Sequence, residues 1–247
     1  MRTVLIPALV LSVLLGAAHG VRGDDAKAII AKALKAHGVA DKPAKQQGIQ
    51  SKSKGTLDVA GGLAFTQETS VQLPNQYKEV MQLEVNGQNL TVATVFDKDK
   101  GWIKAGDKLI DMDEKILAAV KEGLYKAQVL ELAAKGEKGT ELSALGEAKV
   151  NDKPAVGVKV TTKGHRDIDL WFDKEKGLLL KQEWRTVDLQ SGQEVTEETL
   201  ILEYQEVEGR KVAKKLQVNR DGKKFMEGEV QEVKFVEKLD DSEFAKP

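Results

Sequence analysis

The chain has 247 residues, with 38 Lys or Arg and 39 Asp or Glu, so its formal net charge is −1. It contains no cysteine, which excludes disulfides, thiol catalysis, cysteine metal sites and a lipid-modified N-terminal cysteine. The positive charges are interspersed with negative ones and form no basic cluster, which argues against a nucleic-acid-binding protein.

Residues 1–23 are predicted to be a secretory signal peptide. A positively charged start precedes an apolar run at residues 4–15, and small residues follow it. The run is shorter than the ~20 residues that span a bilayer. Cleavage after Gly23 is preferred to cleavage after Gly20, which leaves one domain at 24–247. Export without cysteine favours a soluble protein of a bacterial periplasm.

The first predicted element of the mature chain is a short amphipathic helix at residues 25–37. Apolar residues recur there at helical spacing, and Gly38 is placed to end the helix. His37 lies at the C-terminal end, where the helix dipole favours it, and we interpret it as a structural residue.

From Ile49 the apolar period changes from helical to alternating, which predicts β-strands. The strands predicted in this block are residues 49–59, 63–73, 76–86, 89–96 and 101–105. The spacing of Asp97, Asp99 and Gly101 resembles part of a calcium loop but lacks the remaining ligands. We therefore predict an ordinary reverse turn there and no metal site.

A second helical region follows these strands. Asp111 or Asp113 can cap its start, its apolar residues recur at helical spacing, and Gly136 ends it. Gly123 is predicted to split it into two helices. The pair is expected to cover the sheet, either as a movable lid or as a permanently packed helix.

The pattern in the rest of the chain again predicts β-strands. They are predicted at residues 141–150, 155–162, 168–172, 178–184, 194–205, 211–220 and 223–238. Short turns between neighbours require antiparallel pairing, and a sheet of roughly ten or more strands curls on itself. We expect a mainly β protein with some α-helix, in which a strongly curved antiparallel sheet forms an unclosed half-barrel covered by short helices.

Four short motifs resemble the LolA/LolB-like superfamily of periplasmic lipoprotein carriers. Leu170-Trp171-Phe172-Asp173 with Lys176-Gly177-Leu178 resembles the family's hairpin, and Leu73-Pro74-Asn75-Gln76-Tyr77-Lys78 resembles its Pro-Asn-aromatic strand start. Asp97-Lys98-Asp99-Lys100-Gly101-Trp102 resembles its Asp-Gly-x-x-Trp turn, and the ending Asp240–Pro247 resembles its Phe-x-x-Pro ending. These motifs occur in the family's order over nearly the whole mature chain.

The resemblance implies a carrier that shelters acyl chains of a lipoprotein, or another amphiphile, in a hydrophobic cavity during periplasmic transfer. Its partners would be membrane-bound donor and acceptor proteins, and it would need no cofactor and act as a monomer. The alternating pattern puts a set of apolar residues on one face, and these are the predicted cavity residues: Phe65, Val71, Met81, Leu83, Val92, Phe96, Trp102, Val158, Leu170, Phe172, Leu180 and Trp184. A core filled by these side chains is the alternative to a cavity.

One position departs from the family. In its best-known carrier an Arg directly before the strand-starting Pro bonds to backbone carbonyls of the lid, whereas this chain has Leu73 there. Lys78 is the nearest candidate for a replacement.

No catalytic residues are predicted. The mature chain retains only His37 and His165 as histidines, and it has no Gly-x-Ser-x-Gly motif. His165 lies in a polar turn and is interpreted as a solvated loop residue. The hypothesis that competes with a carrier is a non-catalytic interaction or sensor domain with a filled core, which binds a partner through its sheet edge or outer face.

Overall fold

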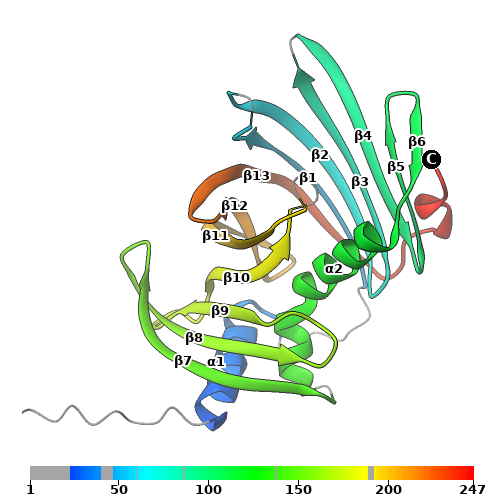
Figure 1. Cartoon of the computed structure of the whole chain (residues 1–247). Coiled ribbons are helices and arrows are strands. Elements are labelled where there is room, and N and C mark those ends of the chain that lie inside the picture. The colour runs from blue at the N-terminus through cyan, green and yellow to red at the C-terminus, as the bar shows by residue number, and fades with distance from the viewer. Residues whose placement is uncertain (1–22, 40–46, 60, 86, 137, 189–191) are drawn as a thin grey trace, which may run out of the picture.

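The computed structural model describes residues 23–39, 47–59, 61–85, 87–136, 138–188 and 192–247. These residues form one antiparallel sheet of 13 strands in the order β6-β5-β4-β3-β2-β1-β13-β12-β11-β10-β9-β8-β7. The first six strands lie at the top of Figure 1 and β7 to β9 at the bottom, with the remaining strands curving between them. Strands β6 and β7 are the two edges of the sheet and do not pair with each other, so the barrel is unclosed.

The strands have these bounds: β1 Gly48–Leu57, β2 Leu63–Gln72, β3 Gln76–Val85, β4 Gln88–Asp97, β5 Lys100–Ala105, β6 Lys108–Asp111, β7 Thr140–Val150, β8 Lys153–Thr162, β9 Ile168–Asp173, β10 Leu179–Val187, β11 Glu194–Val207, β12 Arg210–Arg220 and β13 Lys223–Val236. The predicted fold class is confirmed. Strands that are neighbours in sequence pair with each other, except β6 and β7, which are the two edges. In addition, β1 pairs with β13 and joins the two blocks. Strand β6 was not among the predicted strands.

Helix α1 spans Gly23–Ala36, which agrees with the predicted first helix. Gly38 follows it with a φ of +69°, a conformation that a side chain makes unfavourable. The predicted signal peptide lies almost wholly outside the described residues. No helix of the part that the structure describes is both long and apolar enough to cross a membrane.

Helix α2 spans Glu114–Lys135 and runs along the concave side of the sheet (Figure 1). Asp113 caps its start by accepting a hydrogen bond of 2.9 Å from the backbone N–H of Ile116, and Gly136 ends it in the left-handed conformation. The predicted split at Gly123 is wrong, since the helix continues through it. Glycine inside a helix costs only about 1 kcal/mol relative to Ala, which the packing of the later turns exceeds.

Two predicted turns show how the polar residues reverse the chain. Between β9 and β10, Asp173 accepts hydrogen bonds from the backbone N–H groups of Glu175 and Lys176, and Gly177 has a φ of +74°. Between β4 and β5, a two-residue turn begins at Lys98, whose φ is +59°. The predicted turn residues Asn86 and Ser191 lie outside the described residues.

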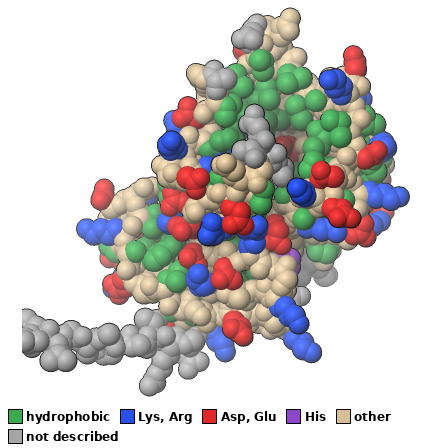
Figure 2. All heavy atoms as spheres, in the orientation of Figure 1, with side chains coloured by type: hydrophobic (Ala, Val, Ile, Leu, Met, Phe, Trp, Pro, Cys, Tyr) green, Lys and Arg blue, Asp and Glu red, His purple; other side chains and the backbone are tan. Residues whose placement is uncertain are grey.

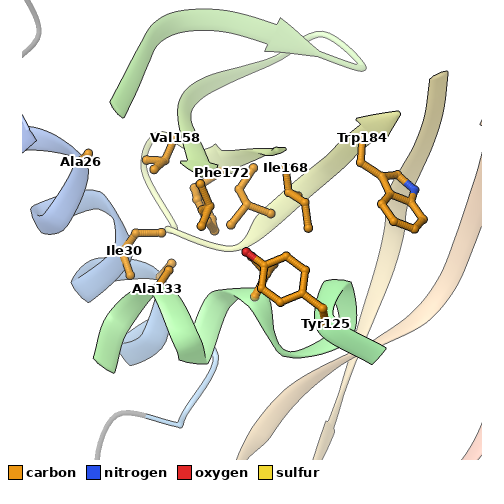
Figure 3. Packing of buried hydrophobic residues seen from close by; sticks show 12 residues of the cluster. Ala26, Ile30, Tyr125, Ala133, Val158, Ile168, Phe172 and Trp184 are labelled. Atoms are coloured by element: carbon orange, nitrogen blue, oxygen red, sulfur yellow. The ribbon is translucent and has the colours of Figure 1, made fainter. Parts of the chain in front are cut away.

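The largest buried cluster fills the concave face at the β7 to β10 end of the sheet. Ile30 of α1 and Val129 of α2 pack there against Ile168 and Phe172 of β9. Figure 3 shows these helices and strands pointing their apolar side chains toward one another. This end of the half-barrel is therefore closed by its own side chains.

Candidate functional site

A pocket of about 820 Å³ lies where the filled cluster ends, between α2 and the concave face of the sheet. Its α2 wall consists of the turns around Gly123. Its sheet walls come from β2 to β4 on one side and β10 to β12 on the other, with one residue each from β1 and β13 between them. The lining residues are Leu57, Val59, Val71, Tyr77, Glu79, Thr94, Ala119, Val120, Gly123, Leu124, Lys126, Ala127, Trp184, Thr186, Val187, Asp188, Glu197, Arg220 and Phe225. Most of them are apolar, which is typical of a ligand site for an aliphatic molecule.

One wall of the pocket is built by β2, β3 and β4. Because side chains on neighbouring strands share a face when they are paired, Val71 lies beside Tyr77, and Glu79 lies beside Thr94. All four line the pocket. This wall therefore combines one aliphatic group with a phenol, a carboxyl group and a hydroxyl group.

The carboxyl group of Glu79 is held by two protein donors. Its Oε2 accepts a hydrogen bond of 2.6 Å from the hydroxyl of Tyr77 and one of 2.5 Å from Nε2 of Gln67. Burial raises the pKa of Glu79, although the two hydrogen bonds act in the opposite direction. Burial also raises the pKa of Tyr77 well above its ordinary value, so its hydroxyl stays protonated and remains a donor.

The opposite wall carries a compact network of charges. Glu197 of β11 pairs with Lys126 of α2 at 2.9 Å and with Arg220 of β12 at 3.3 Å, and it accepts a 3.1 Å hydrogen bond from Nε1 of Trp184. Arg220 also pairs with Asp188 at 2.9 Å. Burial alone would raise the pKa of Glu197, but these partners hold it below the ordinary value. The network thus ties α2 to the strands beyond the pocket.

Beyond Glu79 the concave face of β3 continues into an open apolar face. On this face Met81 of β3 lies opposite Val92 of β4, and Leu83 lies opposite Leu90. The open apolar face comprises Met81, Leu83, Leu90, Val92, Ile103 and Ile110. Leu90 and Ile110 are exposed. Figure 2 shows hydrophobic side chains gathered over the β1 to β6 part of the molecule.

Seven of the twelve predicted cavity residues lie in or beside the pocket on the concave side of the sheet. Val71 and Trp184 line the pocket. Met81, Leu83 and Val92 belong to the open apolar face beside it. Phe65 and Phe96 lie on the concave side of the same strands, and both are buried.

Three further predicted cavity residues lie in the filled part of the half-barrel. Val158, Leu170 and Phe172 are wholly inaccessible to solvent in the cluster formed by α1, α2 and the strands β8 to β10. At this end the filled core is present, because α1 and the C-terminal turns of α2 supply enough apolar side chains to occupy the space. The pocket begins where those side chains end.

The last two predicted cavity residues, Leu180 and Trp102, lie on the opposite face of the sheet. A bulge between Leu179 and Lys181 shifts the register, so Leu180 packs with Leu200 in a separate cluster. The two-residue turn after β4 pairs Trp102 with Val95, and the two pack with Phe244 near the C-terminus. Simple alternation along the sequence fails at such points.

Lys78 was the candidate for a contact to the helix that covers the sheet, because Leu73 stands where the resembled family has Arg. Lys78 pairs with Glu243 in the C-terminal 3₁₀ helix, Asp241–Phe244, at 3.3 Å, so it is not a contact to α2, and that prediction is wrong. Instead, Gln182 of β10 donates a 3.0 Å hydrogen bond from Nε2 to the backbone carbonyl of Lys126 in α2. No sequence signal singled out Gln182, because glutamine at an inward position of a strand is not distinctive.

The two histidines lie away from the pocket lining. His165 stacks on Tyr125 of α2 with ring centroids 3.9 Å apart, and its Nδ1 lies 2.8 Å from Oε1 of Glu122. His37 is partly buried at the end of α1, and its Nδ1 lies 2.8 Å from the carbonyl oxygen of Ala33. Within the described ranges, no group of three or more His, Asp or Glu side chains is arranged to hold a metal ion.

Solved structures share this architecture. An outer membrane lipoprotein-sorting protein domain from Vibrio parahaemolyticus matches with a TM-score of 0.54 and 12% identity, over 91% of this chain and 98% of that one. A LolA superfamily protein from Nitrosomonas europaea matches with a TM-score of 0.57 and 12% identity, over 90% and 97%. A DUF1329 family protein from Desulfovibrio piger matches with a TM-score of 0.54 and 15% identity, over 89% and 97%.

No protein-family model matches the chain, and no curated protein matches it. The likeness is therefore one of three-dimensional structure at low sequence identity. The resemblance predicted from the four motifs is confirmed at that level: the chain has the fold of LolA superfamily and lipoprotein-sorting domain proteins.

Proposed function

We propose that this chain is an exported, non-catalytic carrier that shelters the acyl chains of a lipoprotein, or of another amphiphile, in the pocket beneath α2. In this proposal residues 1–23 are removed on export, and 24–247 act as a single monomeric domain in the periplasm. Membrane-bound donor and acceptor proteins hand over and receive the cargo. Val71 and Trp184 contact its acyl chain.

The observation that carries the proposal is the pocket itself. Its volume of about 820 Å³ lies within the usual range for ligand sites, and its walls are mainly apolar. Each methylene group that a guest buries there contributes about 0.8 kcal/mol. The open apolar face continues from the pocket along β3 and β4 and offers room for the rest of a long chain.

Gly123 permits a direct test. It lines the pocket from α2, and a Cβ added there meets no other atom within 4 Å. Gly123→Phe should therefore project a ring into the pocket without a backbone clash. Gly123→Ala is the matched control, since it makes the same backbone change without the bulk and should stabilise the helix by about 0.5–1 kcal/mol.

The measurement is binding of an apolar fluorescent dye and its displacement by dodecanol, accompanied by native mass spectrometry of each purified protein for bound lipid. The wild type and Gly123→Ala should bind dye and carry lipid, and Gly123→Phe should do neither while unfolding at a similar temperature. Equal dye binding by Gly123→Phe, or no binding by the wild type, would overturn the proposal.

A second candidate function is a partner-binding module, and it is favoured by strand β6. This strand is an edge of the sheet, and Leu109 and Ile110 on it are exposed, at 42% and 54%. Exposed apolar edge strands are suited to pairing with a strand of another protein. Absence of bound lipid together with loss of partner binding on Ile110→Lys would select this function instead.

A further inference from the structure

The pocket contains one carboxyl group whose hydrogen-bonding capacity is only half used. Oε2 of Glu79 accepts from both Tyr77 and Gln67. Oε1 of the same group accepts no hydrogen bond from the residues that the structure describes. An ionised carboxylate has acceptor sites on both oxygens, so Oε1 remains available to a donor from outside the protein.

The position of Glu79 makes this oxygen accessible to a guest. Glu79 lines the pocket, and its in-register neighbours on the concave face are Thr69 and Thr94. The next inward residue on β3 is Met81, at the start of the open apolar face. A guest whose chain lies along this face therefore passes the carboxyl group.

The other charged groups of the described pocket lining are paired with one another. Lys126 pairs with Glu197, and Arg220 pairs with both Glu197 and Asp188. Glu79 takes part in no ion pair among the described residues. The lining thus carries two cations against three carboxyl groups, and Glu79 is the carboxyl group that has no cationic partner among the described residues.

A partly buried carboxylate without a cation is costly in apolar surroundings, and a donor on a guest would offset that cost. An anionic head group at the same place would instead meet a like charge.

Resting on the proposed carrier function, we infer that Glu79 selects the guest's head group: the pocket takes amphiphiles whose head donates hydrogen bonds, an amine or a hydroxyl group, in preference to carboxylates. Tyr77 and Gln67 position the carboxyl group, and the guest's N–H or O–H is received by Oε1. The chain of the guest lies against the aliphatic lining.

The test compares three probes with the same chain length: dodecylamine, dodecanol and dodecanoate, each below its micelle concentration at pH 7.5. Displacement of an apolar dye should rank their affinities as amine, then alcohol, then carboxylate. A hydrogen bond to a charged group is worth enough to change affinity by about tenfold. Glu79→Gln should therefore weaken dodecylamine binding about tenfold and dodecanoate binding not at all.

Glu84→Gln is the matched control, because Glu84 lies on the same strand, is exposed, and alternates to the opposite face. It should leave all three affinities unchanged.

A second variant, Tyr77→Phe, retains the carboxyl group and removes one of its protein donors. Dodecylamine should then bind severalfold more tightly, which loss of folding does not produce.

The outcomes separate this inference from the carrier function. If the dye and all three probes fail to bind the wild type, the proposed carrier function is wrong, and so is the role inferred for Glu79. If the probes bind the wild type with equal affinity, or Glu79→Gln retains the amine preference while Tyr77→Phe leaves dodecylamine binding unchanged, only the role of Glu79 is overturned.

Discussion

Lys126 of α2 and Glu197 of β11 form an ion pair in one wall of the pocket, with Nζ and Oε1 2.9 Å apart. The two side chains are only 17% and 12% exposed. Nζ of Lys126 also lies 4.8 Å from the centre of the Trp184 ring, a cation–π contact. This pair links α2 directly to β11 at the wall of the pocket.

Lys126→Met is expected to destabilise the fold by about 1–3 kcal/mol. Breaking a buried pair leaves the other charge uncompensated, but Glu197 keeps its bonds from Trp184 and Arg220, which limits the loss. Urea unfolding measures the change. Lys121→Met is the control: its pair with Asp99 is exposed, so it should cost less than about 1 kcal/mol. Equal losses in the two variants would contradict the role assigned to Lys126.

Phe172→Ala is expected to cost about 3–5 kcal/mol, because the ring is fully buried in the cluster between α1 and α2 and its removal leaves a cavity. Val71→Ala, at the partly exposed pocket wall, should cost about 1 kcal/mol or less. Thermal and urea unfolding of the two variants check this difference. A small loss for Phe172→Ala would show that this end of the half-barrel is not a packed core.

The C-terminal segment is anchored by packing more than by charge. Phe244 is buried against Val95 and Leu239 on the outer face of the sheet. Phe244→Ala should therefore cost about 3 kcal/mol or more. Lys78→Met removes the partly exposed pair with Glu243 and should cost about 1 kcal/mol or less. Denaturant midpoints compare the two, and the reverse order would be inconsistent with this anchoring.

His37 should make stability depend on pH. Burial lowers its pKa, outweighing the hydrogen bond to Ala33, so the folded state favours the neutral ring. The unfolded chain binds the proton more readily, and this contribution to stability is present above the ordinary pKa of 6.5 and is lost as the pH falls below it.

We therefore expect the wild type to lose more stability than His37→Phe when the pH falls from 7.5 to 5.5. The free energy of unfolding in urea, measured for both proteins at each pH, gives the comparison. The substitution keeps an aromatic ring in its edge-on contact with Tyr204, 5.7 Å between centroids, so the packing is matched. Parallel pH dependences would show that His37 is not responsible.

The sequence predicted local structure correctly where a few adjacent residues determine it. The cap of α2 and the helix ends at Gly38 and Gly136 depend on a few adjacent residues. Both helix ends were predicted correctly, and Asp113 was one of the two residues predicted for the cap. The split predicted at Gly123 was wrong, because a glycine weakens a helix only slightly and the packing of Val129 and Ala133 stabilises the helix.

The candidate site was predicted only in part. Alternation placed Val71 and Trp184 on the concave side, where they line the pocket. It failed at Leu180, where a bulge changes the register, because bulges depend on the partner strand. Glu79 and Lys126 were not singled out, since each is one of many charged residues in a chain that is 31% charged.

The sequence by itself determined the antiparallel half-barrel, because its strands, short turns and capped helices are encoded by residues close together along the chain. Only the tertiary structure decided which part of the concave face is filled and which is hollow. That depends on where α1 and α2 lie against strands far away in sequence, and on registers that bring Glu79, Lys126 and Glu197 around one pocket.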